Sequence, residues 1–442
     1  MKSIIYIFSF IFMALNMQAQ YHFEEWVERY NGPDSLWDLA SEIDADGNIY
    51  VAGISAANRD GNTYIDLTIL KYNDAGDLLW VQTVEDKYEP RDMALDGNGN
   101  VIVTAAGIPE IGGEHEIFTV AYDADGNSLW SAEYDGSPEA LAVDRRGNVY
   151  IGGRSDADAV LLKYNSSGSL VWEKKNRQGI IYDVATDSRI NCVYTTGTTN
   201  NKLVTAMYFP NGYEWWATQT DLPYSSGFGI ATDNRLNIYI TGRSNYSPLS
   251  DFVTVKYNLR GQVQWMEFFN GSLDNDDYPS DIAVSSSGNV YVTGRTTVDV
   301  SPGYPVSDMA TLKYNTNGVL QWVQTFDGAL NKSDAALALA LDEDENVYVT
   351  GYSVNEGSTF NDDYTTISYT TNGDMQWIQH YNGPGSGSDR ANDLALDPEG
   401  NVYVTGYSFG GSTGYDFATV KYSLLDPSNP DNPFDFVGRM HN

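Results

Sequence analysis

The chain has 442 residues, of which 60 are acidic and 25 are basic, so its formal net charge is -35. This surplus of negative charge repels nucleic acid and anionic membrane surfaces, and the expected partners are therefore neutral, cationic or bridged by metal ions. The single cysteine, Cys192, excludes an internal disulfide framework and any metal site built from several cysteines.

The N-terminus has the layout of a secretory signal peptide. Lys2 precedes an apolar run at 4–15, and a short polar segment ends at Ala19. The run is too short to span a bilayer, and no later segment approaches the roughly 18 uninterrupted apolar residues of a membrane helix. We expect a signal peptide over residues 1–19 and a secreted, monomeric protein in the periplasm, on the cell surface or outside the cell. An integral membrane protein is not expected.

A segment related to Gly-Asn-Val-Tyr-Val-Thr-Gly organises the rest of the chain. It is intact at 288–294 and at 400–406. Its eight copies recur every 44 to 57 residues, a period typical of propeller blades. The copies end at Gly53, Ala105, Gly153, Gly197, Gly242, Gly294, Gly351 and Gly406.

Two constant spacings predict four strands, a to d, in each repeat. An Asp-x-x-Gly-Asn turn, as at 397–401, precedes the repeated segment and suits a tight hairpin between strands a and b. A Tyr and a Trp eight residues apart, as at Tyr314 and Trp322, enclose a Gly and predict a second hairpin between c and d. Strand b is apolar almost throughout, as expected of a strand covered on both faces. The fourth copy has one extra residue at Cys192, which we interpret as a β-bulge.

The two ends of the repeat array complement each other. The exported chain begins with an isolated strand d that carries Trp26, and it finishes with strands a, b and c of a last repeat that lacks its own strand d. Pairing of these fragments closes a ring and removes two exposed sheet edges. The sequence therefore predicts an all-β, eight-bladed propeller of four-stranded antiparallel blades over residues 20–422, followed by a flexible tail over 423–442.

The repeat resembles a known family. The segment Asp-Pro-Glu-Gly-Asn-Val-Tyr-Val-Thr-Gly at 397–406, followed by Asp-Phe-Ala-Thr at 416–419, is similar to the bacterial SBBP β-propeller repeat, and the similarity extends over essentially the whole exported chain. This resemblance implies a secreted or surface propeller and supplies no catalytic residues. The family name suggests seven blades, whereas our prediction of eight rests on this sequence.

The sequence contains no convincing catalytic motif. Gly-x-Ser-x-Gly at 406–410 matches a nucleophile elbow, but Gly-x-Ser also follows several other copies of strand b, and a strand rather than a helix comes next. We therefore predict no catalytic residue and no cofactor. Seven of the eight repeats carry an acidic residue six positions before the strand-c Tyr, either as an acceptor for loop backbone or as a weak Ca²⁺ ligand. These residues are Asp66, Glu116, Asp158, Asp251, Asp308, Asp363 and Asp416.

Aromatic residues divide into periodic and isolated ones. The eight periodic Trp residues, such as Trp322, are predicted to pack between blades. Trp215 neighbours one of them on a strand d that we expect to be covered on both faces, so we predict that it is packed as well. Trp37 lies in a loop, where an exposed ring could stack on a sugar or anchor a protein.

Loop lengths predict which face of the ring binds a ligand. The a–b and c–d turns lie on one face and are uniform, whereas the b–c and d–a connections lie on the opposite face and vary in length. Function is usually carried by such variable loops on a rigid scaffold. The longest connections belong to repeats one and six to eight. The candidate ligand-binding residues, together with Asp393 near the ring axis, are Trp37, Asp38, Asp276, Asp277, Tyr278, Tyr304, Asp362, Asp363, Asp389, Asp393 and Tyr415.

We therefore expect a secreted binding or scaffold module that recognises an extracellular glycan or protein through this variable face. Two alternatives remain open. A polysaccharide hydrolase or lyase would use paired carboxylates at the channel mouth, such as Asp281 and Asp393. A structural component of an extracellular matrix would need neither a ligand-binding face nor paired carboxylates.

Overall fold

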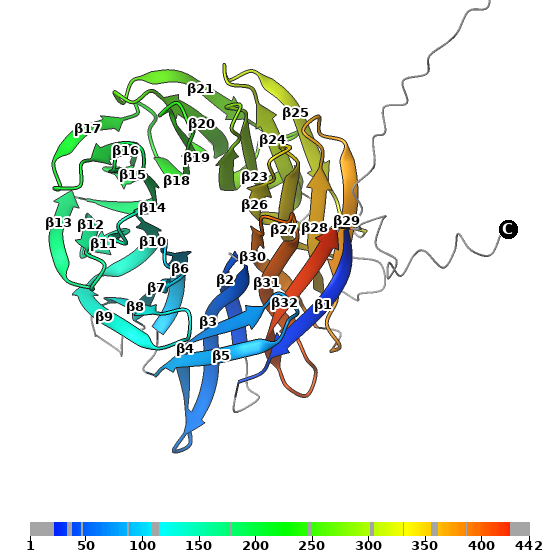
Figure 1. Cartoon of the computed structure of the whole chain (residues 1–442). Helices are drawn as coiled ribbons and strands as arrows, with labels where there is room; N and C mark the ends of the chain where they lie inside the picture. The colour runs from blue at the N-terminus through cyan, green and yellow to red at the C-terminus, as the bar shows by residue number, and fades with distance from the viewer. Residues whose placement is uncertain are drawn as a thin grey trace, which may run out of the picture.

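The computed structural model is a ring of eight four-stranded antiparallel sheets arranged around a central axis (Figure 1). It describes residues 22–32, 38–45, 47–85, 88–107, 115–176, 178–244, 250–300, 305–329, 331–354, 361–385 and 387–424. For residues 38–42, 44, 45 and 424 only the backbone is described. All regular structure within these ranges is β, and the predicted eight-bladed propeller is confirmed.

The first four blades follow the chain, each from its innermost to its outermost strand. Blade 1 contains β2 (Asp38–Ala45), β3 (Asn48–Arg59), β4 (Asn62–Asn73) and β5 (Leu78–Val84). Blade 2 contains β6 (Tyr88–Leu95), β7 (Val101–Gly107), β8 (Glu116–Tyr122) and β9 (Ser128–Asp135). Blade 3 contains β10 (Ser137–Val143), β11 (Val149–Ser155), β12 (Asp158–Tyr164) and β13 (Leu170–Asn176). Blade 4 contains β14 (Gly179–Asp187), β15 (Cys192–Thr199), β16 (Lys202–Tyr208) and β17 (Glu214–Gln219).

The next three blades repeat the same order. Blade 5 contains β18 (Ser225–Thr232), β19 (Ile238–Ser244), β20 (Asp251–Tyr257) and β21 (Val263–Phe269). Blade 6 contains β22 (Tyr278–Val284), β23 (Val290–Asp299), β24 (Val306–Tyr314) and β25 (Leu320–Phe326). Blade 7 contains β26 (Ala335–Leu341), β27 (Val347–Val354), β28 (Asp362–Tyr369) and β29 (Met375–Tyr381).

Blade 8 joins the two ends of the chain and closes the ring, as predicted. It combines β30 (Arg390–Leu396), β31 (Val402–Phe409) and β32 (Tyr415–Leu424) with β1 (His22–Tyr30) as the outermost strand. Strand β1 pairs antiparallel with β32 from His22 opposite Leu424 to Tyr30 opposite Phe417. Figure 1 shows the blue β1 beside the red β32.

The hydrophobic core lies between neighbouring blades. Strand b of each blade is buried along most of its length; in β23, Val290, Tyr291 and Val292 are all 0% exposed. One buried cluster, for example, joins Tyr50 and Leu67 of blade 1 to residues of blade 2. The near-continuous apolar pattern of strand b therefore does reflect burial on both faces of the sheet.

The periodic Trp residues pack where one blade meets the next, as predicted. Trp322 donates its indole N–H to the carbonyl of Thr371 in the c–d turn of the following blade, at 3.1 Å. In this turn Gly373 has a φ of 87°, and a Cβ at this position would lie 2.9 Å from the indole ring. Glycine is therefore needed both for the left-handed backbone and for the close approach.

Trp377 differs from the other seven because the following blade has no c–d turn. Its neighbour is blade 8, in which strands c and d are the two ends of the chain. The His22 ring packs on the indole instead, with ring centres 5.0 Å apart, and the indole nitrogen has no hydrogen-bond partner within the described ranges. Trp377 is 7% exposed. At the closure of the ring, the His22 side chain thus takes the place that a c–d turn occupies in the other blades.

Two local predictions are wrong. Trp215 is 40% exposed, because strand d is outermost and one of its faces meets solvent. The extra residue near Cys192 makes no bulge; Cys192 pairs with Asp187, and the residue lengthens the a–b turn, where Asn191 takes a left-handed φ of 52°.

Bulges occur instead in the innermost strand of every blade. The register between strands a and b shifts by one residue at the same position in all eight sheets. The residues at which the register shifts are Ser41, Arg91, Glu139, Tyr182, Phe228, Ser280, Leu337 and Asn392. Each blade therefore presents one extra residue on its channel strand.

Candidate functional site

Asp277 and Asp389, both predicted ligand residues, are buried. The Asp277 carboxylate accepts hydrogen bonds from the backbone N–H of Gly271 at 2.7 Å and of Thr297 at 3.0 Å. Asp389 is bound in the same way by the N–H groups of Gly383 at 3.0 Å and Phe409 at 2.8 Å. Both side chains are 0% exposed, and burial raises the pKa of both carboxyl groups. They hold a d–a connection against the neighbouring strand b.

A regular Gly–Asp spacing in the sequence accounts for this arrangement, but it was not used in our predictions. Gly and Asp lie six residues apart in four of the d–a connections, at 32–38, 271–277, 328–334 and 383–389. In the third connection, the Asp334 carboxylate accepts the two equivalent backbone hydrogen bonds. In the three connections whose Asp side chain is described, a buried carboxylate therefore binds backbone N–H groups at two separate points.

The remaining candidates of blades 7 and 8 form a polar and aromatic group. Asp362 makes an ion pair with Arg390 at 2.5 Å, and the Arg390 guanidinium lies 4.2 Å from the ring centre of Tyr352. Asp363 is 3% exposed. The Tyr415 ring packs edge-on against Tyr407 and Phe409, with ring centres 5.4 Å and 5.3 Å away. Trp37 and Tyr304 lie outside the described residues, as does the side chain of Asp38.

Four carboxylates occupy the same position in the channel strands of alternate blades. They are Asp92, Asp183, Asp281 and Asp393. Each binds the N–H of the next residue and an N–H of the following blade; for Asp281 these are Ile282 at 2.7 Å and Leu339 at 2.9 Å. Burial raises the pKa of Asp281 to about 6, and burial together with repulsion from Asp281 and Asp92 raises the pKa of Asp393.

These contacts connect blades in pairs. Asp393 links blade 8 to blade 1 through the N–H of Ile43 at 3.1 Å, across the closure of the ring. Both carboxylate oxygens of Asp281 and of Asp393 accept backbone hydrogen bonds, which favours a structural role for these two residues. The alternative of a carboxylate-dependent hydrolase remains an untested prediction.

Two guanidinium groups that were not predicted from the sequence lie close to the Tyr278 ring. The Arg295 guanidinium is 4.6 Å from the Tyr278 ring centre, and the Arg243 guanidinium is 5.4 Å from it. All three side chains are partly exposed. Among the described residues, neither arginine forms an ion pair with a carboxylate. Asp276, beside Tyr278, accepts a hydrogen bond from the Ser250 N–H at 2.7 Å.

An aromatic pair extends this group along the channel mouth. The bulge residues Tyr182 and Phe228 contact each other edge to face with ring centres 5.1 Å apart. Burial and Glu139 raise the pKa of Tyr182, while the nearby charges of Arg154 and Arg243 oppose this shift. We call the following set the rim arc: Arg154, Tyr182, Phe228, Arg243, Tyr278 and Arg295. Its sequence signal is an Arg directly after the final Gly of three repeats.

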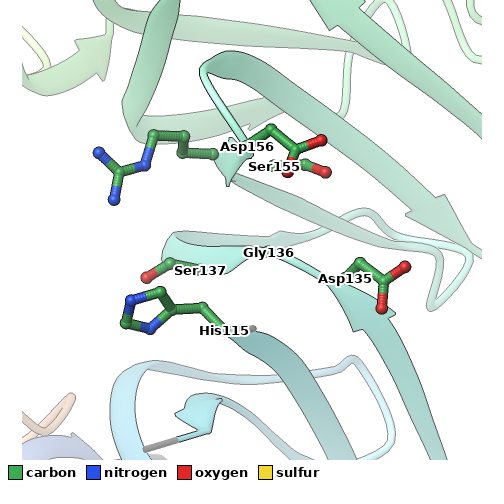
Figure 2. Close-up of a pocket in the computed structure, with 7 residues that line it drawn as sticks. His115, Asp135, Gly136, Ser137, Ser155 and Asp156 are labelled. Atoms are coloured by element: carbon green, nitrogen blue, oxygen red, sulfur yellow. The ribbon is translucent and has the colours of Figure 1, made fainter. Parts of the chain in front are cut away.

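A pocket of about 170 Å³ lies at one end of the rim arc, between blades 2 and 3 (Figure 2). It is lined by His115, Asp135, Gly136, Ser137, Arg154, Ser155 and Asp156. Figure 2 shows His115 and Ser137 on one wall and Asp156 on the opposite wall. Arg154 belongs to both the pocket and the rim arc, so the pocket adjoins the arc.

Comparisons with known proteins agree with this architecture. Residues 269–300 and 376–411 match the family model described as the SBBP β-propeller repeat, which confirms the resemblance predicted from the sequence. No described residue belongs to a helix that could cross a membrane.

Two curated proteins are similar in sequence. An uncharacterized WD repeat-containing protein, L264, of Acanthamoeba polyphaga mimivirus is 25% identical over 414 residues, which cover 72% of this chain and 28% of the viral protein. The regulatory protein FlaEY of Caulobacter vibrioides is 28% identical over 142 residues, which cover 26% of this chain and 15% of FlaEY. The chain spans less than a third of the length of either relative.

Two solved structures share the fold. The C-terminal WD40 domain of Sif2 superposes with a TM-score of 0.57 over 92% of this chain and 98% of that domain, at 8% identity. Hydrazine synthase of Kuenenia stuttgartiensis superposes with a TM-score of 0.51 over 77% of this chain and 96% of its own, at 11% identity. At these identities the likeness extends to the fold alone.

Proposed function

Because the chain is an eight-bladed propeller with SBBP repeats, we propose that it is a secreted binding module that recognises an acidic extracellular glycan at the rim arc. The observation that carries this proposal is that the guanidinium groups of both Arg243 and Arg295 contact the Tyr278 ring and form no ion pair with a carboxylate among the described residues. A partly exposed guanidinium is a ready donor for a ligand.

The chemistry of the rim arc favours a sugar acid. A guanidinium donates a planar pair of N–H groups that matches a carboxylate or a sulfate. Tyr182, Phe228 and Tyr278 are partly exposed and offer ring faces on which a pyranose can pack. Because the net charge of -35 repels anions at long range, binding depends on these short-range contacts rather than on attraction from a distance.

Binding to a panel of uronic-acid, sulfated and neutral glycans tests the proposal. The parent protein should bind one acidic class, and the double variant Arg243→Ala/Arg295→Ala should bind it at least about tenfold more weakly, because a hydrogen bond to a charged group is worth about 1.5–3 kcal/mol. Arg235→Ala/Arg260→Ala is the matched control, since both are exposed arginines in turns of the opposite face. Equal binding by the double variant and the parent would exclude the rim arc.

The same experiment separates the alternatives. Shortened glycan products would favour the hydrolase or lyase, and binding of an acidic peptide but no glycan would favour a protein partner. Export, which is part of the proposal, is supported by the apolar run at 4–15. Deletion of residues 1–19 should retain the protein inside the cell.

A further inference from the structure

Three carboxylates meet where blade 6 connects to blade 7. Asp308 lies in β24, Asp327 directly follows β25, and Asp334 directly precedes β26. One carboxylate oxygen from each of the three residues lies within 4.8 Å of the corresponding oxygens of the other two. Asp327 is exposed, so the group is open to solvent on one side.

The Asp308 carboxylate lacks a partner inside this group. Its side chain is 8% exposed, and its buried Oδ1 atom accepts no hydrogen bond from the described part of the chain. Asp334 is 0% exposed, and its carboxylate accepts hydrogen bonds from the backbone N–H groups of Gly328 at 2.5 Å and Val354 at 3.2 Å. Burial and the nearby negative charges raise the pKa of Asp308 to about 6 and that of Asp334 to about 7.

Other repeats show what compensates the charge at this position. Asp416 is the counterpart of Asp308 in blade 8, and it forms an ion pair with Arg29 at 2.7 Å. In blade 1 the counterpart Asp66 is paired with Arg59. In blade 6, within the described residues, no Arg or Lys forms an ion pair with any member of the group.

We propose that Asp308, Asp327 and Asp334 bind a divalent cation, and the ligand type favours Ca²⁺. All three ligands are carboxylates, which hard cations prefer. The three oxygens lie within 4.8 Å of one another, so one ion can reach all of them. Ca²⁺ accepts irregular arrangements of oxygen ligands, whereas Mg²⁺ demands a near-ideal octahedron. The ion ties β24 and the end of β25 to β26, and so connects two blades.

Asp327→Asn is the decisive variant. The residue before the Gly of the six-residue spacing is Asn31, Asn270 or Asn382 in the other three long connections, and Asp only at 327. Asparagine is therefore compatible with this loop. Loss of an outer-shell partner already weakens metal binding by about 10- to 100-fold, so loss of a ligand should weaken it by at least about tenfold.

Calorimetric titration of chelator-treated full-length protein with CaCl₂ measures this difference. The parent should show one more site than Asp327→Asn, and its melting temperature should rise with Ca²⁺ while that of the variant rises less. Weak binding to the acidic surface is common to both proteins and cancels in the comparison. An equal number of sites with equal affinity in the two proteins would overturn the proposal.

A gain of binding provides an independent test. At the junction of blades 5 and 6, Asp251 is 7% exposed with an unpartnered Oδ1, and Asp277 is fully buried, but Asn270 stands in the place of Asp327. Asn270→Asp should therefore add a second Ca²⁺ site. If circular dichroism shows that Asp327→Asn does not fold, Asn270→Asp provides the test instead. An unchanged number of Ca²⁺ sites in Asn270→Asp would overturn the proposal.

Discussion

Arg29 connects the N-terminal strand to the rest of the ring, and its replacement tests how the ring is closed. From β1 its guanidinium donates to the hydroxyl of Tyr381 at 2.9 Å, to Oγ and the carbonyl of Ser408 at 2.5 Å and 2.9 Å, and to Oδ2 of Asp416 at 2.7 Å. The substitution Arg29→Met keeps most of the apolar stem and removes all of these bonds. The contacts span blades 7 and 8, so both should be affected.

The magnitude follows from the burial of the ion pair. The side chains of Arg29 and Asp416 are 20% and 5% exposed. Removing one partner of a buried pair costs about 3–5 kcal/mol, and the partial exposure of Arg29 places the expected loss near the lower end, at about 3 kcal/mol. The double variant Arg29→Met/Asp416→Leu leaves no uncompensated charge, so it should recover about 1–2 kcal/mol of this loss.

Urea unfolding followed by tryptophan fluorescence measures these differences. Arg235→Met is the control, because Arg235 is exposed on the opposite face and its replacement should change stability by about 0.5 kcal/mol or less. An Arg29→Met midpoint equal to that of the parent would refute the reasoning. So would a double variant that is less stable than Arg29→Met alone.

Three further predictions concern stability. Because Trp322 is only partly buried, Trp322→Ala should cost about 2–3 kcal/mol of stability, less than the value of about 3–5 kcal/mol for a fully buried ring. Trp215 is exposed, so Trp215→Ala should be nearly neutral. Denaturant unfolding midpoints of the two variants measure the difference. The pKa of Asp281 is about 6 in the folded protein and about 3.9 in the unfolded chain, so its ionisation lowers the stability of the fold as pH rises from about 4 to 6. Asp281→Asn should therefore show a smaller fall in the denaturant midpoint over that range. Deletion of 22–30 should lower the melting temperature far more than deletion of 425–442, because only the former exposes the edge of β32; equal melting temperatures would contradict ring closure through β1.

The architecture could be predicted from the sequence because it depends on contacts within each repeat. The spacing from Tyr314 to Trp322 and the turn at 397–401 each specify a hairpin, and hairpin register is set by the residues of the turn itself. The Asp397 carboxylate, for example, binds the backbone N–H of Asn401 at 2.8 Å, within the same turn. The split last repeat then required closure of the ring.

The neighbours of each functional side chain were decided only by the tertiary structure. Arg243 and Arg295 approach Tyr278 from two different blades, and no periodicity within a single repeat brings the three residues together. The same holds for Asp308 and Asp334, whose β24 and β26 belong to adjacent sheets.

Burial also separated residues of one type that the sequence could not distinguish. Asp276 and Asp277 are adjacent in the chain, yet Asp277 is 0% exposed and accepts hydrogen bonds from two backbone N–H groups and the Thr296 hydroxyl, while Asp276 is partly exposed. Side-chain direction alternates along an extended chain, and a loop changes that alternation with every turn. The sequence by itself determined the number of blades, because the blades are built from local hairpins, and it indicated the closure, because the last repeat is split between the two ends of the chain. The packing of one blade against the next decided which charges meet, because those contacts join residues from different repeats.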